Sequence, residues 1–176
     1  MLARTAFAAT GLVTVMLGVT SPATADSGAS TATITITGGA LSISVPTVAV
    51  NLGTRADTVT GGTITGPLGQ VQVNDARSAA AGSGWVTSVI SSAFTPSAGP
   101  AIAASAVGYT TGPITKVGTA TYAANDPSDL TGVTAAVTAT GITGDNSATW
   151  TPSIHVTVPG GMAAGVYSAT ITHSVV

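Results

Sequence analysis

The sequence predicts an all-β protein: a single antiparallel β-sandwich, of the immunoglobulin-like or Greek-key type, that follows a cleaved signal peptide. Three observations lead to this prediction. Apolar residues alternate with Thr and Ser in short runs, which is the pattern of a strand with one dry and one wet face. Gly, Pro, Asn and Asp separate about ten such runs at the spacing of a sandwich. The composition, 44% hydrophobic and 6% charged, is opposite to that of a disordered chain.

Residues 1–25 have the organisation of a secretory signal peptide. Arg4 precedes an apolar stretch over residues 6–19, and Ala23-Thr24-Ala25 provides an A-x-A cleavage site. We therefore predict cleavage after Ala25, a mature domain over residues 26–176 and an extracellular location. The apolar stretch is shorter than the ~20 residues that a membrane-spanning helix needs. We expect no transmembrane segment in the mature chain.

The predicted strands follow each other closely along the mature chain. In residues 32–37, Ile34 and Ile36 alternate with threonines, and residues 41–45 alternate Leu, Ile and Val with serines. The later runs have the same character. They cover residues 58–65, 70–75, 85–91, 102–109, 114–122, 133–140, 149–158 and 166–175.

Turn-forming residues set the expected boundaries of these strands. Residues 125–127 (Asn-Asp-Pro) and 144–146 (Gly-Asp-Asn) are predicted turns. We expect a loop over residues 75–84, in which three alanines also permit a short helical turn. No long helix is expected.

The few aromatic residues are expected to be centres of the core, since large apolar side chains are scarce. They are Trp85, Phe94, Tyr109, Tyr122, Trp150 and Tyr167. Period two places Trp150 and Ile154 on one face of residues 149–158 and His155 on the solvent face. The same reasoning places His173 among core residues of the last strand, and we expect its imidazole to bond to the backbone rather than to serve a metal or a reaction.

The composition offers little material for catalysis or for metal binding through sulfur. The chain has no cysteine, its six acidic residues are all Asp, and only four residues are Lys or Arg. A nucleic-acid partner is excluded because such proteins need clusters of basic residues. The G-x-S-x-G motif is absent. Residues 125–129 and Asp145-Asn146 resemble oxygen-ligand loops for calcium, but we favour the interpretation that they are turn-forming Asp and Asn. We expect no enzyme activity and no cofactor.

Asp75 and Arg77 form the one charge pattern that stands out. Only three basic residues lie in the mature region, and this Asp-x-Arg precedes a Gly-Trp, Gly84-Trp85. We expect the two charges to be paired. If the pair is partly buried, it fixes the strand end that presents Trp85.

These residues also resemble a known family. Residues 71–77 (VQVNDAR), then a small-residue segment and residues 84–89 (GWVTSV), resemble the first conserved block of WxL-type surface domains. Residues 150–159 and 164–175 resemble the second block, a tyrosine, here Tyr167, followed by Leu-Thr-Trp-x-Leu. Thr87 stands where the naming Trp-x-Leu motif has Leu, and His173 stands where the second block has Trp.

The resemblance implies a diverged WxL-like domain whose anchors are Asp75, Arg77, Gly84, Trp85, Trp150, Tyr167 and His173. Such domains are secreted, β-rich and not enzymes, and they attach noncovalently to the Gram-positive cell wall. The implied partners are peptidoglycan or another wall polysaccharide, and other surface proteins. A self-associating structural or adhesive surface domain remains the alternative interpretation, and a secreted hydrolase is the least supported one.

Overall fold

The structure of the protein, a computed structural model, describes residues 30–176. The predicted signal peptide lies outside the described residues. Within the described residues, the chain divides into two units at Thr35 and Ile36. The fold below is that of the second unit.

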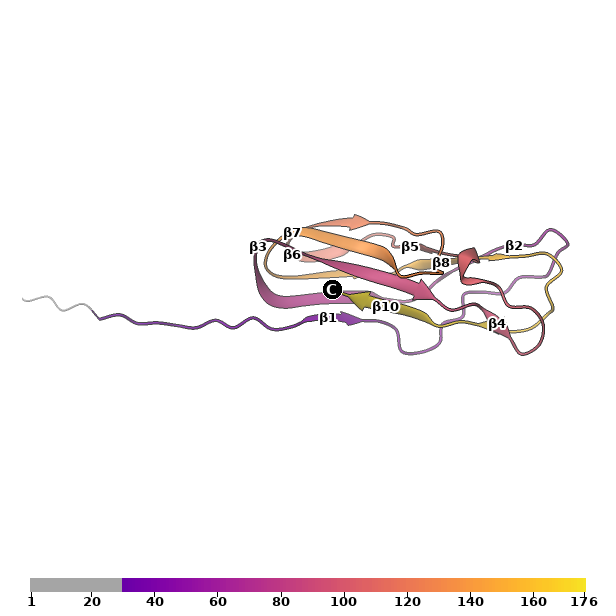
Figure 1. Ribbon diagram of the computed structural model, residues 1–176, viewed down its shortest axis with the longest axis horizontal. Helices are drawn as coiled ribbons and strands as arrows, with labels where there is room; N and C mark the ends of the chain where they lie inside the picture. The colour runs from indigo at the N-terminus through magenta and orange to yellow at the C-terminus, as the bar shows by residue number, and fades with distance from the viewer. Residues whose placement is uncertain (1–29) are drawn as a thin grey trace, which may run out of the picture. The chain divides into compact units, whose positions relative to one another are not determined.

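Antiparallel strands make up almost all the regular structure of residues 30–176, which confirms the prediction of an all-β sandwich (Figure 1). The only helical element there is a single 3-10 turn, Ala104–Ala106. The strands are β1 (Leu41–Ser44), β2 (Gly62–Pro67), β3 (Val71–Ser91), β4 (Thr95–Pro96), β5 (Val107–Thr110), β6 (Thr115–Ala124), β7 (Thr134–Trp150), β8 (Ser153–Val158), β9 (Tyr167–Ser168) and β10 (Ile171–Val175).

The two longest strands, β3 and β7, form a ribbon that bends in its middle. They pair from Val71 opposite Trp150 to Val89 opposite Thr134, with register shifts over residues 75–85 of β3. Bulges of this kind bend a strand and increase its twist. The prediction of a loop over residues 75–84 is therefore wrong, because both strands stay paired through the bend.

Residues with positive φ permit the bend. Ser78 and Gly82 in β3 have φ of 52° and 90°, and Gly141 and Gly144 in β7 have φ of 64° and 72°. The turn predicted at residues 144–146 is thus a kink within β7. Figure 1 shows β3 running to one end of the folded unit, turning there and running back.

Two core clusters lie inside the sandwich. One joins both halves of the bent ribbon, with Val71 and Trp150 from one half against Trp85 and Val137 from the other. The other packs the β3–β7 ribbon against β5 and β8, around Tyr109. Trp85, Trp150, Tyr109 and Phe94 are buried as predicted, whereas Tyr122 and Tyr167 are only half-buried.

The remaining strands extend this framework. The larger sheet has the order β1-β3-β7-β6, with β10 also paired to β3, and the smaller sheet has the order β2-β8-β5. β1 pairs with the first half of β3, and β10 pairs with the second half. Strands β7 and β8 divide the predicted strand 149–158 at Thr151-Pro152.

The strand predicted over residues 32–37 does not form. β1 follows β3 only as far as Gly39, whose N–H bonds to the carbonyl of Ala76. Beyond that point β3 bends, so the ladder offers no partner to the preceding residues. Ile34 and Ile36 are 87% and 80% exposed.

No helix in residues 30–176 is both long enough and apolar enough to cross a membrane.

Candidate functional site

The Asp75–Arg77 pair lies at the bend of the β3–β7 ribbon, and the two charges are paired as predicted. Arg77 Nε donates to Asp75 Oδ1 at 2.8 Å, and Arg77 Nη2 donates to Oδ2 at 3.0 Å. The backbone N–H of Arg77 also donates to Oδ1, at 3.1 Å. Asp75 is fully buried, whereas the Arg77 side chain is 36% exposed. The guanidinium thus neutralises the carboxylate from its solvent side.

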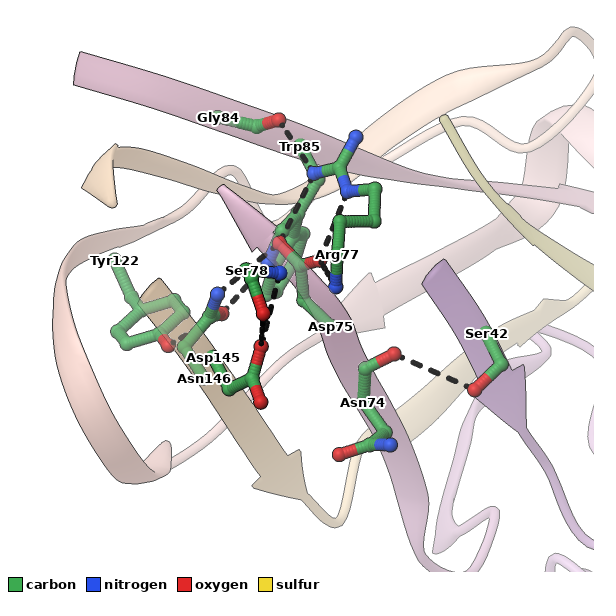
Figure 2. Close-up of polar contacts among 10 residues, drawn as sticks. All are labelled: Ser42, Asn74, Asp75, Arg77, Ser78, Gly84, Trp85, Tyr122, Asp145 and Asn146. Atoms are coloured by element: carbon green, nitrogen blue, oxygen red, sulfur yellow. Dashed lines mark hydrogen bonds and ion pairs between the residues drawn. The ribbon is translucent and has the colours of Figure 1, made fainter. Parts of the chain in front are cut away.

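Asn146 of β7 connects this pair to Trp85. Its amide donates to Asp75 Oδ2 at 3.0 Å, and its Oδ1 accepts from Trp85 Nε1 at 3.0 Å. Tyr122 Oη of β6 donates to the same Oδ1 at 3.3 Å, and its ring lies 5.5 Å from the ring of Trp85. Figure 2 shows these side chains converging between β3, β6 and β7. Asp75, Arg77, Trp85, Tyr122 and Asn146 are called the Asp75 network below.

The Asp75 network also fixes the backbone of the bend. Arg77 Nη2 donates to the carbonyl of Gly84 at 3.1 Å, just before Trp85. A Cβ on Gly84 would lie 2.6 Å from the carbonyl oxygen of Ala139, so a side chain at this position would force the backbone to shift. On the β7 side, Asp145 Oδ1 accepts from the Ser78 N–H at 2.9 Å. These contacts determine the direction in which Trp85 enters the core.

The electrostatics of Asp75 fit a structural role. Hydrogen bonds from Arg77 lower the pKa of Asp75 to about 2, against the opposing effect of burial. The two carboxylate oxygens together accept four hydrogen bonds, which fills the capacity of an ionised carboxyl group. Asp75 therefore keeps no free lone pair for a substrate proton or a metal ion.

A second polar chain links Trp150, Tyr109 and His173 across the core. Trp150 Nε1 donates to Tyr109 Oη at 2.8 Å, and Tyr109 Oη lies 3.3 Å from His173 Nε2. Burial raises the pKa of Tyr109 to about 12 and lowers the pKa of His173 to about 4. The buried Nδ1 of His173 has no hydrogen-bond partner among residues 30–176.

Three sequence predictions about polar side chains need correction or refinement. His173 lies among core residues as expected, but its polar partner is the hydroxyl of Tyr109 and not the backbone. His155 does not extend freely into solvent, because its Nδ1 and Nε2 lie 3.0 Å and 2.9 Å from the hydroxyls of Thr65 and Thr110. Tyr167 is apart from both polar groups, and its hydroxyl donates to the carbonyl of Ala163 at 2.8 Å.

His155 borders a cavity of about 270 Å³ on the outer face of the smaller sheet. Most of the polar groups that line it are hydroxyls, with one carboxylate. They come from Thr110, Asp126, Ser128, His155 and Thr157. One oxygen of Asp126 accepts the Thr111 N–H at 2.7 Å. This cavity offers hydroxyls, an imidazole and a carboxylate as groups for binding the hydroxyls of a ligand.

Side chains of the segments that resemble calcium-binding loops make hydrogen bonds within the protein. Asp129 Oδ1 accepts from the Thr131 N–H at 2.8 Å, and Asn146 is committed to the Asp75 network. Within residues 30–176, no three His, Asp or Glu side chains are grouped so that they could hold a metal ion.

Sequence reasoning missed Asn146 and Thr87 as polar residues of the core, and it missed the hydrogen bonds of the Tyr109 hydroxyl, although it placed the Tyr109 ring in the core. Thr87 is fully buried, and its hydroxyl accepts from the Val137 N–H at 3.0 Å and donates to the Val137 carbonyl at 3.3 Å. A hydroxyl thus bridges to β7 where the resembled motif has Leu. Asn146 gave a misleading signal, because Gly-Asp-Asn is a typical turn sequence.

A search of protein-family models, curated proteins and solved structures finds no match to this chain.

Proposed function

We propose that the protein is a non-enzymatic secreted domain that is retained at a Gram-positive cell wall through noncovalent contacts with peptidoglycan or another wall polysaccharide. The observation that carries the proposal is the joining of Asp75, Arg77, Gly84 and Trp85 at one bend. These four residues belong to the two segments, residues 71–77 and 84–89, that resemble the first block of WxL domains. Their contacts show that the two resembling segments form one structural unit.

In this proposal the motif residues shape the domain and do not touch the wall. Asp75 and Trp85 are buried, and the hydrogen-bonding groups of Asp75 are occupied. The proposal therefore places the ligand elsewhere on the surface. The residues that resemble the motif and the residues that bind the wall are thus different residues in this proposal.

The cavity beside His155 is the proposed wall-binding surface. Sugars present many hydroxyls, which bond well to carboxylates, imidazoles and other hydroxyls held in fixed positions. The contacts of His155 with Thr65 and Thr110 hold its ring in place. A preformed site of this kind loses little conformational entropy on binding.

A pull-down on purified peptidoglycan tests the proposal. We expect the purified protein to sediment with peptidoglycan, and Thr157→Leu, which removes a hydroxyl from the cavity, to weaken binding about tenfold, or ~1.4 kcal/mol. Thr172→Leu is the matched control, since Thr172 is an exposed threonine of β10 outside the cavity. Full recovery of the wild type in the supernatant contradicts wall retention. Equal losses in both variants contradict the cavity as the site.

Self-association is the second candidate function. The exposed Ile34 and Ile36 favour it, because two large apolar side chains at strand spacing lie uncovered.

A further inference from the structure

We infer that residues 32–37, called the N-terminal arm, add as a strand to the open edge of β6 in a second copy of this chain. The inference goes beyond wall retention and does not depend on it. The arm has the sequence ATITIT, in which β-branched residues fill five of six positions. Such residues strongly favour a strand. In the structure the arm is nevertheless unpaired, with its isoleucines in solvent.

The longest open strand edge in the described part of the chain belongs to β6. β6 ends the order β1-β3-β7-β6 and pairs only with β7. Register shifts around Gly118 divide it into two parts. The second part, residues 119–124, is called the β6 edge here and has the same length as the arm. Lys116 and Gly118, a charge and a bulge of the kind that protect edges, both lie in the first part.

The inward face of the β6 edge is an incomplete piece of core. Ala120 and Tyr122 pack against the cluster around Trp85 but are only half-buried. Trp85 and Tyr122 both lie opposite Ala139, one from each side of β7. This row of side chains across the sheet ends at Tyr122, because no further strand in residues 30–176 pairs with β6.

The arm has the side chains that would continue this row. Ile34 and Ile36 have the same two-residue spacing as Ala120 and Tyr122, so an added strand places both isoleucines on the half-buried face. The threonines of the arm then lie on the outer face beside Thr119 and Thr121, which are exposed. Cross-strand pairs of threonines are favourable. Neither segment carries a charge that would oppose the pairing.

A second copy must supply the arm, because a chain cannot reach its own β6 edge. β3 and β7 lie between β1 and β6, so three strand spacings, ~14 Å, separate them. The N–H of Gly39 is hydrogen-bonded to Ala76, so Gly38 is the only residue between this fixed point and the arm. One residue spans about 3.5 Å, which is far less than this separation. Each copy thus gives one arm and accepts one, and two copies that exchange arms form a closed pair. Head-to-tail contacts between different neighbours instead produce open chains of molecules unless a ring closes.

Light scattering on the purified full chain tests self-association, with N-terminal sequencing to establish where the processed protein begins. We expect a mass above that of the monomer that grows with concentration. Ile34→Ser with Ile36→Ser should reduce the mass to that of the monomer. Val48→Ser with Val59→Ser, two exposed valines outside the arm, is the matched control and should leave it unchanged. A monomeric wild type, or equal loss in the control, overturns the inference.

Disulfide cross-linking tests the pairing itself, and the chain has no native cysteine to confuse it. Mixing Thr35→Cys with Thr121→Cys under mild oxidation should give a reducible dimer that contains one copy of each variant. Thr35→Cys mixed with Thr172→Cys, at an exposed position of β10, should give several-fold less of the mixed dimer. Equal yields overturn the pairing with β6. All three threonines are exposed, so each variant should fold.

Peptidoglycan binding separates the two proposals. If the Ile34→Ser, Ile36→Ser variant is monomeric and still sediments with the wall, the arm serves assembly alone. If the wild type assembles but stays in the supernatant, wall retention fails while this inference stands.

Discussion

Asn146 shows how one side chain can join three parts of a core. It bonds to Asp75 on β3, to Trp85 beyond the bend and to Tyr122 on β6. An amide suits this position because it donates and accepts at the same time. Neither Asp nor Leu offers both functions to a carboxylate and an indole N–H.

Asn146→Ala should therefore lower the free energy of unfolding by about 3 kcal/mol. The substitution leaves Trp85 Nε1 without its acceptor and removes one donor from the buried Asp75, and an unsatisfied buried polar group costs about 1–3 kcal/mol. Chemical denaturation measures the change. Asn125→Ala is the control, because the side chain of Asn125 makes an exposed bond to Thr138. Similar losses in both variants would contradict the role of Asn146.

Acid should destabilise the protein in two steps. Burial lowers the pKa of His173 to about 4 from the ordinary 6.5. The unfolded chain takes up this proton at higher pH than the folded chain, so stability falls as the pH decreases from 6.5 towards 4. Asp75, with its pKa lowered to about 2 from 3.8, adds a further loss below pH 3.8.

His173→Phe should remove the first step and keep the second. Urea denaturation at pH 7, 5.5 and 4.5 measures the first step for both proteins. Parallel stability curves for wild type and variant over this range would show that another group titrates.

At the scale of elements, the bend of the β3–β7 ribbon organises the fold. Bulges, four residues with positive φ and the contact from Arg77 to Gly84 all fall in this short region. The bend brings the two halves of each strand into one core cluster. At the bend, β3 also turns away from the line of β1, so the N-terminal arm has no strand to pair with in the described part of the fold and is exposed.

Gly84→Ala should destabilise the fold by about 2 kcal/mol, since a Cβ there meets the Ala139 carbonyl at 2.6 Å and overpacking costs 1–3 kcal/mol. Gly132→Ala is the matched control, because nothing lies within 4 Å of the Cβ that it adds. Thermal unfolding compares the two. A Gly84→Ala variant as stable as the Gly132→Ala variant would show that β3 and β7 can separate there without cost.

At the scale of the whole folded unit, β3 and β7 contribute to both core clusters. Neither cluster can open while the other stays intact, since they share these two strands. We expect one cooperative unfolding transition. Far-UV circular dichroism and tryptophan fluorescence should report the same midpoint, because Trp85 and Trp150 lie in the cluster that spans the bend. Two separate midpoints would contradict a shared framework.

Local chemistry predicted much of this protein correctly. Period-two patterns located most strands, because a half-buried strand requires alternation wherever it lies. The scarcity of large apolar residues identified Trp85 and Trp150 as buried. The proximity of Asp75 and Arg77, in a chain with few charges, predicted their ion pair.

The same local rules failed where pairing partners decide the outcome. Residues 32–37 have a strong strand pattern but no neighbouring strand, and a strand needs its hydrogen bonds from outside itself. Residues 75–84 have a loop composition, yet they stay paired because β7 bends with them. The sequence around Asn146 predicts a turn, but Asn146 is buried in the structure.

The sequence by itself determined the strand-rich class, the buried tryptophans and the paired charges, since these follow from composition and from residues close together along the chain. Only the tertiary structure decided that β3 folds back at Arg77, that Asn146 joins Asp75 to Trp85, and that the arm and the β6 edge remain open. Those outcomes depend on contacts between residues far apart in sequence, and no local pattern encodes which strand lies beside which.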